Sequence, residues 1–444
     1  MSILFSAQRF EIKNKNKQID KSLLIFYLNI DLRRLYNKIS QMQFNLFNET
    51  KEAYIRIKDY LNYIPMYYSH SLSERYNCNI FFKLENLQRT GSFKIRGALN
   101  CILKNIDNCK KGIITASAGN HAQGIAFGAK LFDLKSLIIM PKNTPLMKIN
   151  NTENYGAKVI IYGENYNEAS IYAKSLAEQE NLFFIHPFND LDVISGQGTI
   201  ALEILEEKPN INAFIIPVGG GGLISGVGCY AKHVNNDILI YGVQSEKVSS
   251  MYNSILQNNV VTVPGLNTIA DGISVHKVEE ITFNLCKKYT DQILTVKEGD
   301  ISKAILFLIE QSKLIVEGAG ATTLAAILSN KIEIAKKNVV LILSGGNIDV
   351  NLISRVINKG LAASYRLIQI TVILDDTPGS LNKITKVIGE CEANILDLKH
   401  NRNDLYLDIG QSKVSFDLEV KGKEHINSLL NEISKSGYEV FVNE

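Results

Sequence analysis

Lys94 is the residue whose type and surroundings point most directly to chemistry. It lies in the segment 86–99, NLQRTGSFKIRGAL, at the predicted entry to a helix. Phe93 and Ile95 flank it, and apolar neighbours lower the pKa of a lysine amine and make it nucleophilic, as Schiff-base formation requires. Most lysines are exposed helix charges, so a reactive amine is a hypothesis that needs partner residues.

A second segment, 115–123, reads TASAGNHAQ and follows a predicted strand. Its small residues let backbone N–H groups approach a ligand, and the amide of Asn120 can donate or accept a hydrogen bond. The alternative is an ordinary strand-to-helix turn in which Gly119 supplies only backbone freedom. His121 has no partner base in view and is interpreted as structural.

Four consecutive glycines, Gly219, Gly220, Gly221 and Gly222, separate a predicted strand from a predicted helix. They expose N–H donors at the positive end of the helix, which favours binding of an anion or a phosphate. The run departs from the GxGxxG dinucleotide fingerprint and lacks the GK[ST] of a P-loop. We therefore expect a phosphate group there but no dinucleotide.

The segment 343–349, LSGGNID, ends another apolar run and contributes Ser344. Ligands of open α/β sheets gather at the carboxyl ends of the strands, so Ser344, the glycine run, 117–120 and Lys94 are expected to converge on one cleft. A reactive lysine, a phosphate site and polar groups for a ring together predict pyridoxal phosphate as the cofactor.

The elements that position these residues are indicated by short, continuous apolar runs, which are typical of strands buried on both faces. The runs are 80–84, 112–115, 136–140, 158–162, 183–186, 213–218, 238–243 and 339–343. Helix-length segments such as 120–131, 167–178 and 302–311 separate most of them, and 49–61 has the spacing of an amphipathic helix. The pattern predicts an α/β fold with a doubly wound, mainly parallel sheet.

The same pattern divides the chain into four parts. Residues 1–41, rich in Lys, Asn and Gln, are interpreted as a poorly ordered extension or a short helical arm, 42–358 as a catalytic domain and 359–365 as a linker. The last part, 366–444, predicts a ferredoxin-like βαββαβ module. Its elements are expected at 368–374, 380–390, 395–399, 414–420, 425–433 and 439–442.

Composition excludes several classes of protein. With 444 residues, 45% hydrophobic and 21% charged, the chain has the proportions of a globular protein. A net charge of +3 is too small to favour nucleic acid, and no apolar run approaches the roughly 18 residues of a membrane span. The 6 cysteines form no CxxC pair, so we expect neither a zinc cage nor a disulfide framework, and a cytoplasmic location.

A series of segments occurs in the order of one known family: SFKIRGA, SAGNHAQG, GQGT, PVGGGGLISG, TIADGI, EGAGA and LSGGN. Through them the chain from about residue 49 to 358 resembles the pyridoxal-phosphate-dependent threonine dehydratases (threonine ammonia-lyases) of fold type II. The resemblance implies doubly wound sheets in two subdomains. The C-terminal module resembles an ACT regulatory domain, with DDTPGSL at 375–381 as its first strand-to-helix turn.

The resemblance also implies how the cofactor is held. Lys94 would form the Schiff base with it and later remove the substrate Cα proton, with Phe93 packed beside the ring. Asn120 would bond the ring hydroxyl, Gly219 to Gly222 would hold the phosphate, and Ser344 would face the pyridine nitrogen. Because a hydroxyl does not enforce a protonated ring nitrogen, loss of a β-leaving group competes well.

For the substrate, the resemblance implies that Ser117, Gly119 and Asn120 hold the carboxylate. L-Threonine would then give 2-oxobutanoate and ammonia, and L-serine would give pyruvate. The threonine product would lie on a route toward isoleucine. The residues leave the preference between the two substrates open.

Three positions depart from the family pattern. Ala118 stands where serine racemases usually carry a second serine, which favours dehydration over racemisation. Gln244 weakens the divalent-cation site of related racemases, and no metal is assigned. Gly318 replaces a common proline in EGAGA, although Glu317 is still expected near the cofactor pocket. The alternatives are a serine dehydratase or racemase of the same fold, and a catalytically silent amino-acid sensor, which retention of Lys94 disfavours.

The ACT resemblance implies pairing across subunits, and therefore a homo-oligomer, either a dimer or a tetramer. It further implies an amino-acid effector such as isoleucine or valine near Pro378 and Gly379. The alternative is a module that only supports oligomerisation, because a fold does not fix a ligand.

Overall fold

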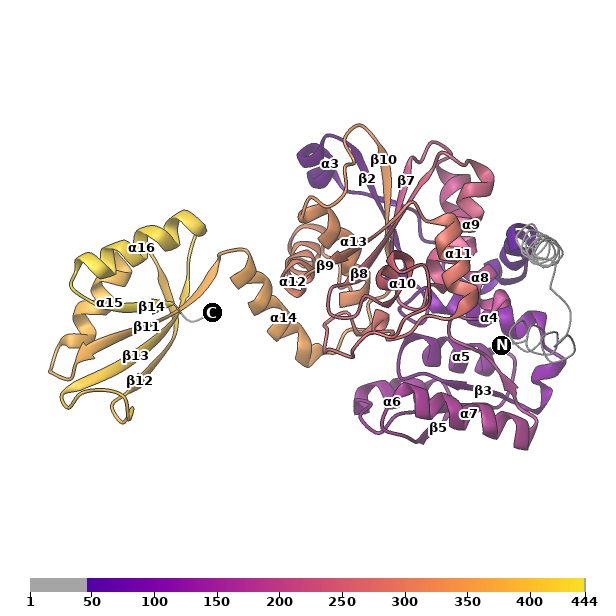
Figure 1. Cartoon of the computed structure of the whole chain (residues 1–444), viewed down its shortest axis with the longest axis horizontal. Helices are drawn as coiled ribbons and strands as arrows, with labels where there is room; N and C mark the ends of the chain where they lie inside the picture. The colour runs from indigo at the N-terminus through magenta and orange to yellow at the C-terminus, as the bar shows by residue number, and fades with distance from the viewer. Residues whose placement is uncertain (1–45, 443–444) are drawn as a thin grey trace, which may run out of the picture.

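The computed structural model describes residues 46–442, so the predicted extension at 1–41 lies outside the described residues. The helix predicted at 49–61 is helical over 46–57 and is followed by a 3-10 turn over Lys58–Tyr60. Ala53 and Ile57 are fully buried. Beyond them lies a large α/β region with two sheets. A single helix, α14 (Val350–Ala363), joins this region to a smaller C-terminal module (Figure 1).

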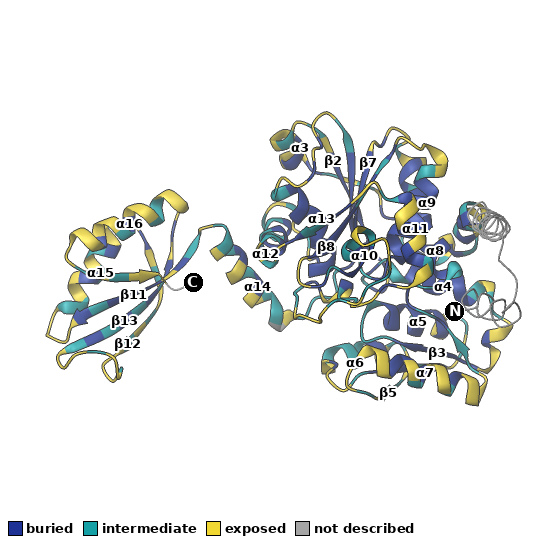
Figure 2. Ribbon diagram, in the orientation of Figure 1, coloured by how far each residue is buried: buried dark blue, intermediate teal, exposed yellow. Residues whose placement is uncertain are grey.

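The larger sheet has six strands, and all neighbouring pairs except β1–β2 are parallel. In spatial order they are β1 (Tyr67–Tyr68), β2 (Asn79–Leu84), β10 (Asn338–Leu343), β7 (Ala213–Pro217), β8 (Leu239–Ser245) and β9 (Gln292–Val296). Its central strands are buried along their length (Figure 2). They can be continuously apolar because helices cover both faces of the sheet.

One or two helices separate most successive strands of this region. They are α3 (His70–Tyr76), α4 (Lys94–Lys104), α8 (Leu191–Glu207), α9 (Gly222–Val234), α10 (Ser250–Leu256), α11 (Glu280–Tyr289), α12 (Glu298–Phe307) and α13 (Gly318–Leu328). The predicted helix at 302–311 begins earlier, as α12, and a π-helical turn over Leu308–Ser312 continues it.

The smaller sheet contains four parallel strands in the order β5 (Lys158–Ile161), β4 (Ser136–Met140), β3 (Ile113–Ala116) and β6 (Phe183–Phe184). Three helices pack around it: α5 (Asn120–Leu131), α6 (Leu146–Asn154) and α7 (Tyr166–Glu180). The doubly wound, mainly parallel α/β fold in two subdomains is therefore confirmed.

The C-terminal module confirms the predicted βαββαβ order. Its elements are β11 (Leu367–Asp375), α15 (Ser380–Glu390), β12 (Asn394–Asn401), β13 (Gln411–Glu419), α16 (Lys423–Lys435) and β14 (Val440–Val442). The four strands form an antiparallel sheet in the order β12-β13-β11-β14. Phe416, Ile388 and Ile433 belong to a core that this module closes by itself.

The predicted linker, 359–365, falls largely on the end of α14 rather than on an irregular segment. This helix packs along α12, and Arg366, just after it, forms an ion pair with Glu310 at 2.8 Å. Across residues 46–442, we find no helix that combines the length and the apolar character needed to cross a bilayer.

Candidate active site

Four predicted segments meet at the carboxyl ends of the parallel strands. Residues 117–120 follow β3, the glycine run follows β7, and Ser344 follows β10. Lys94 is the first residue of α4, and the loop before it is tied to β10 because the N–H of Phe93 donates to the carbonyl of Ser344 at 3.0 Å. Lys94 and Ser344 are thus held in fixed relation by the backbone.

The amine of Lys94 is aimed at the protein interior. Its Nζ donates to the carbonyl oxygen of Pro187 at 2.7 Å and lies 5.3 Å from the centroid of the Phe93 ring. Burial lowers the pKa of Lys94 to about 8, and the charge of Glu317 opposes that shift. An amine with this pKa is unprotonated far more often near neutral pH than an ordinary lysine, and the unprotonated form is the nucleophile.

Phe188, the neighbour of Pro187, connects the lysine to the glycine run. A Cβ placed on Gly220 would lie 2.4 Å from the Phe188 ring, and one on Gly222 would lie 3.1 Å from Phe188 Cβ. Gly221 has a φ of 93°, in the left-handed region that favours glycine, and caps the start of α9. Only a chain without side chains can follow this path, which leaves its N–H groups at the positive end of a helix.

The segment after β3 leaves room for a ligand. A Cβ on Gly119 would meet nothing within 4 Å, and the N–H of Gly119 donates to Ser117 Oγ at 3.3 Å. The helix α5 begins at Asn120, so an anion there would also face a helix N-terminus. His121, next in the sequence, is buried, and its Nε2 lies 3.4 Å from the carbonyl of Ile185, in keeping with a structural role.

Glu317 was expected near the cofactor pocket, and the structure places it beside Asn120. Asn120 Nδ2 donates to its two carboxylate oxygens at 2.8 and 3.1 Å. Burial raises the pKa of Glu317 to about 7, and the charge of Asp271 adds to that shift. The signal for it was its place in EGAGA, one of the segments that carry the family resemblance.

Asn347 is a residue that sequence reasoning did not single out. Its Nδ2 donates to Asn120 Oδ1 at 2.8 Å, to the carbonyl of Thr90 at 2.8 Å and to Gln123 Oε1 at 3.2 Å. It therefore sets the orientation of the Asn120 amide. The signal was its place in LSGGN, at the end of a buried strand.

A cavity of about 240 Å³ opens beside Glu317 and Asn347. Charged residues from three elements reach its wall: Lys148 from α6, Asp271 from the short helix Asp271–Ile273, and Arg355 from α14. Lys148 and Asp271 form an ion pair with each other at 2.5 Å. The cavity thus lies between the two sheets and the helix that leads to the C-terminal module.

The two other departures from the family pattern have local explanations. Gln244 is fully buried, and both ends of its amide are used: Nε2 donates to the carbonyl of Val218 at 3.1 Å, and Oε1 accepts from the N–H of Tyr252 at 2.8 Å. A Cβ on Gly318 would lie 2.1 Å from the carbonyl oxygen of Ile269. Glycine at 318 therefore permits a close backbone contact.

A second cavity, of about 380 Å³, lies at the turn between β11 and α15. Pro378 and Gly379 line it, as do His400 and Arg402 from the neighbouring strand and loop. The His400 Nε2 is buried without a hydrogen-bond partner among the described residues. Arg402 forms an ion pair with Asp376 at 2.9 Å. Polar groups thus converge where the sequence predicted an effector.

Comparison with known proteins matches both regions. Residues 57–345 match the family described as pyridoxal-phosphate dependent enzyme, and residues 364–437 match the ACT domain. The chain is 44% identical to an L-threonine ammonia-lyase of Thermotoga maritima. The aligned region has 393 residues and covers 88% of this chain and 98% of that protein.

Solved structures give the same picture for the larger region. The processed form of threonine deaminase isoform 2 from Solanum lycopersicum aligns with a TM-score of 0.68 and 36% identity, over 72% of this chain and 94% of that chain. Maize serine racemase aligns with a TM-score of 0.67 and 34% identity, over 71% of this chain and 98% of that chain.

Proposed function

Because the chain belongs to the family of pyridoxal-phosphate-dependent enzymes and carries an ACT domain, we propose that it is an L-threonine ammonia-lyase. It converts L-threonine into 2-oxobutanoate and ammonia, and L-serine into pyruvate and ammonia. The observation that carries this proposal is the half-buried Lys94, whose amine bonds to Pro187 while the next residue, Phe188, packs on the glycine run. The 44% identity to an L-threonine ammonia-lyase over nearly the whole of that protein supports the choice of substrate.

The residues present fit pyridoxal phosphate group by group. Gly219 to Gly222 form a turn that a Cβ at Gly220 would block, and its N–H groups suit the phosphate. Lys94 offers an amine of lowered pKa for the aldehyde, and Phe93 offers an apolar ring beside it. The Asn120 amide suits the ring hydroxyl, and Ser344 suits the ring nitrogen.

Pyridoxal phosphate, when bound, supplies an electron sink for the charge that develops at the substrate Cα. Ser117, Gly119 and Asn120 orient the substrate carboxylate at the start of α5. Lys94 Nζ would take the proton from the substrate Cα, and its lowered pKa increases the fraction of the amine that is unprotonated and able to do so. Departure of the β-hydroxyl and hydrolysis of the released enamine then give the 2-oxo acid and ammonia.

A serine racemase of the same fold is the second candidate, and the similarity to the maize enzyme favours it. Racemisation needs an acid–base group on the face of the substrate opposite Lys94. Ala118 supplies a methyl group where the related racemases usually carry a hydroxyl, so this chain is better suited to elimination.

Regulation and assembly are further parts of the proposal. Isoleucine or valine binds near Pro378 and Gly379, and the 2-oxobutanoate formed feeds isoleucine synthesis. The chain assembles into a homodimer or a homotetramer through its ACT domain. The exposed Leu405 and Tyr406 in the β12–β13 loop, at 93% and 97% of full exposure, support a protein contact there.

The test is turnover by purified protein with pyridoxal phosphate, assayed on L-threonine and L-serine with and without isoleucine. We expect 2-oxobutanoate from threonine and little D-serine from L-serine. D-Serine as the main product would instead identify a racemase, and no turnover of either amino acid would contradict both enzymes. Light scattering of the same sample gives the number of subunits.

A further inference from the structure

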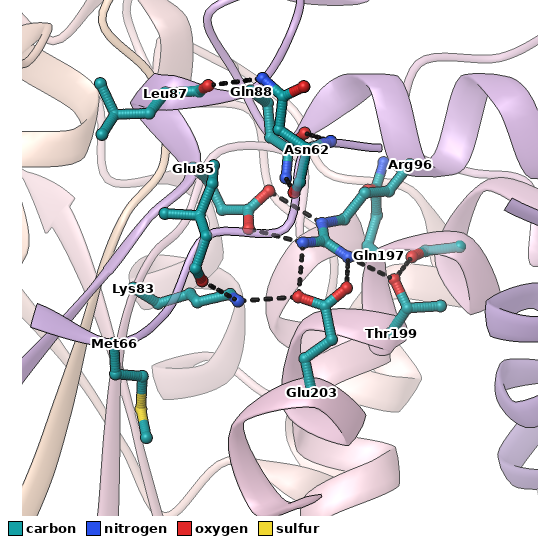
Figure 3. Close-up of polar contacts among 12 residues, drawn as sticks. Asn62, Met66, Lys83, Glu85, Leu87, Gln88, Arg96, Gln197, Thr199 and Glu203 are labelled. Atoms are coloured by element: carbon teal, nitrogen blue, oxygen red, sulfur yellow. Dashed lines mark hydrogen bonds and ion pairs between the residues drawn. The ribbon is translucent and has the colours of Figure 1, made fainter. Parts of the chain in front are cut away.

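A buried ionic cluster lies next to Lys94 in the sequence, through Arg96 on the same helix, and outside the site described above. It consists of Lys83, Glu85, Arg96 and Glu203, whose charges sum to zero (Figure 3). The side chains of Glu85 and Arg96 are fully buried, and that of Glu203 is only 13% exposed. Removing four charges from water is costly, and such clusters are weak evidence for stability. The position of the cluster therefore needs another explanation.

Arg96 is the centre of the cluster, and all five of its N–H groups are used. Nε and Nη2 each donate to Glu85 at 2.8 Å. Nη1 and Nη2 donate to the two oxygens of Glu203 at 2.6 and 2.8 Å, and Nη1 also donates to Thr199 Oγ1 at 3.1 Å (Figure 3). A planar guanidinium holds two carboxylates in fixed orientations, which an ammonium group cannot do.

These bonds join the three elements that surround the lysine. Arg96 lies in the first turn of α4, two residues after Lys94. Glu85 directly follows β2, the sheet neighbour of β10, which leads to Ser344. Glu203 lies on α8, which begins shortly after Pro187, the acceptor of the lysine amine.

The helices α4 and α8 touch through glycine next to the cluster. A Cβ on Gly196 would lie 2.6 Å from Gly97 Cα, so the two backbones are in close contact. Bare backbone fixes the distance between the helices but allows them to rotate and slide. Thr199 and Glu203 lie one and two turns beyond Gly196 on the same face of α8, so their bonds to Arg96 restrict that motion.

The geometry points to Arg96 as a positioning residue for Lys94: its five hydrogen bonds fix the rotation of the first turn of α4 and so hold the lysine amine at its place beside Pro187. This inference rests on the proposed function, because position matters only for a reactive lysine. A misplacement of about 1 Å can reduce the rate of an enzyme about 100-fold.

The test compares two substitutions in the same cluster. Arg96→Lys keeps the charge but cannot hold both carboxylates, while Lys83→Met removes the other cation bonded to Glu203, at 2.7 Å, from strand β2. Both lower the thermal midpoint. In the holoenzyme, we expect Arg96→Lys to lower kcat for L-threonine at least tenfold, with KM changed less than about threefold, and to alter the visible circular dichroism of the cofactor. Lys83→Met should retain kcat within about threefold and the native spectrum.

Hydrogen exchange of amides 94–98 in the cofactor-free protein gives a readout that does not depend on turnover; it should be faster in Arg96→Lys than in Lys83→Met. Equal losses of kcat in the two variants, or an unchanged spectrum in Arg96→Lys, would overturn the inference. If Arg96→Lys does not fold, Thr199→Val, which removes one of the five bonds and keeps the shape, should still lower kcat at constant KM; an unaltered kcat would overturn it. Wild-type protein without turnover refutes the proposed function instead, and the exchange comparison still decides the role of Arg96.

Discussion

Asn120 donates to both carboxylate oxygens of Glu317, at 2.8 and 3.1 Å. The two residues come from different subdomains: Asn120 begins α5 beside the smaller sheet, and Glu317 precedes α13 beside the larger one. A buried carboxylate of raised pKa therefore lies at the junction of the subdomains. Its negative charge raises the pKa of the Lys94 amine. Three predictions concern these groups and the glycine run.

The first prediction concerns how fast the cofactor attaches. The amine of Lys94 reacts when unprotonated, and its pKa is lowered to about 8, so the attachment rate should rise with pH and level off above about pH 8. Glu317 raises the pKa of Lys94, so Glu317→Gln should move the midpoint to lower pH. The measurement is the rise of visible absorbance after mixing cofactor-free protein with pyridoxal phosphate.

Glu153→Gln, which alters an exposed glutamate on α6, is the control and should leave that midpoint in place. Lys94→Ala should give no covalent attachment and no turnover, whereas Lys104→Ala, at the far end of the same helix, should retain both. Turnover that persists in Lys94→Ala would contradict the role proposed for the lysine.

The second prediction concerns stability. The pKa of Glu317 is raised from 4.5 to about 7 in the folded chain, so between these values the folded state binds more protons than the unfolded state. The contribution of Glu317 therefore becomes less favourable as the pH rises from about 4.5 to 7. Glu317→Gln should be more stable than wild type at pH 8, by at most on the order of 3 kcal/mol, and should gain less at pH 5.

Urea unfolding of both cofactor-free proteins at the two pH values checks this expectation. A stability difference between the proteins that is the same at pH 5 and pH 8 would show that Glu317 titrates normally.

The third prediction separates the cofactor from the substrate. A methyl group at Gly220 would lie 2.4 Å from the Phe188 ring, so Gly220→Ala should distort the turn and weaken pyridoxal phosphate binding at least tenfold. A methyl group at Gly119 meets nothing within 4 Å in the protein but enters the space proposed for the substrate carboxylate. Gly119→Ala should therefore raise KM for L-threonine and leave cofactor affinity unchanged, as equilibrium dialysis and steady-state kinetics would measure.

The fourth prediction concerns the effector. Gly379 has a φ of 94° and borders the cavity between β11 and α15, so Gly379→Val should strain the turn and abolish inhibition by isoleucine or valine. The basal rate on L-threonine should remain. Gly389→Ala on α15, where a Cβ meets nothing within 4 Å, is the matched control. Inhibition that survives in Gly379→Val would place the effector elsewhere.

Lys94 was predicted from its residue type and its apolar neighbours, and the other parts of the site that the sequence could predict follow strands. Asn120, the glycine run and Ser344 each come directly after a buried apolar run, and parallel strands bring their carboxyl ends to one edge. Pro187 could not be found in this way, because it acts through its carbonyl oxygen, which every residue has. Phe188 was missed because its role depends on contacts with the distant glycine run. Asn347 stands in LSGGN after a strand, but its role became clear only from its bonds to Thr90, Asn120 and Gln123.

The fold differed from expectation where local signals were weak or misleading. The two-residue strand β1 is too short to produce a pattern, and β9, QILTV, lies at the edge of the larger sheet. A linker was expected at 359–365, yet α14 continues through Gly360 to Ala363. A Cβ on Gly360 would lie 2.8 Å from the carbonyl oxygen of Ser302, so the glycine allows α14 to approach α12.

The continuity of α14 has a mechanical consequence. Its 14 residues form a rod about 21 Å long at 1.5 Å per residue, which begins three residues after Asn347 and ends four residues before β11. A rod of that length does not bend easily, so a tilt that the C-terminal module passes to the helix displaces its opposite end. The loop that contains Asn347, which orients Asn120, is therefore the first part of the active site that such a displacement would reach.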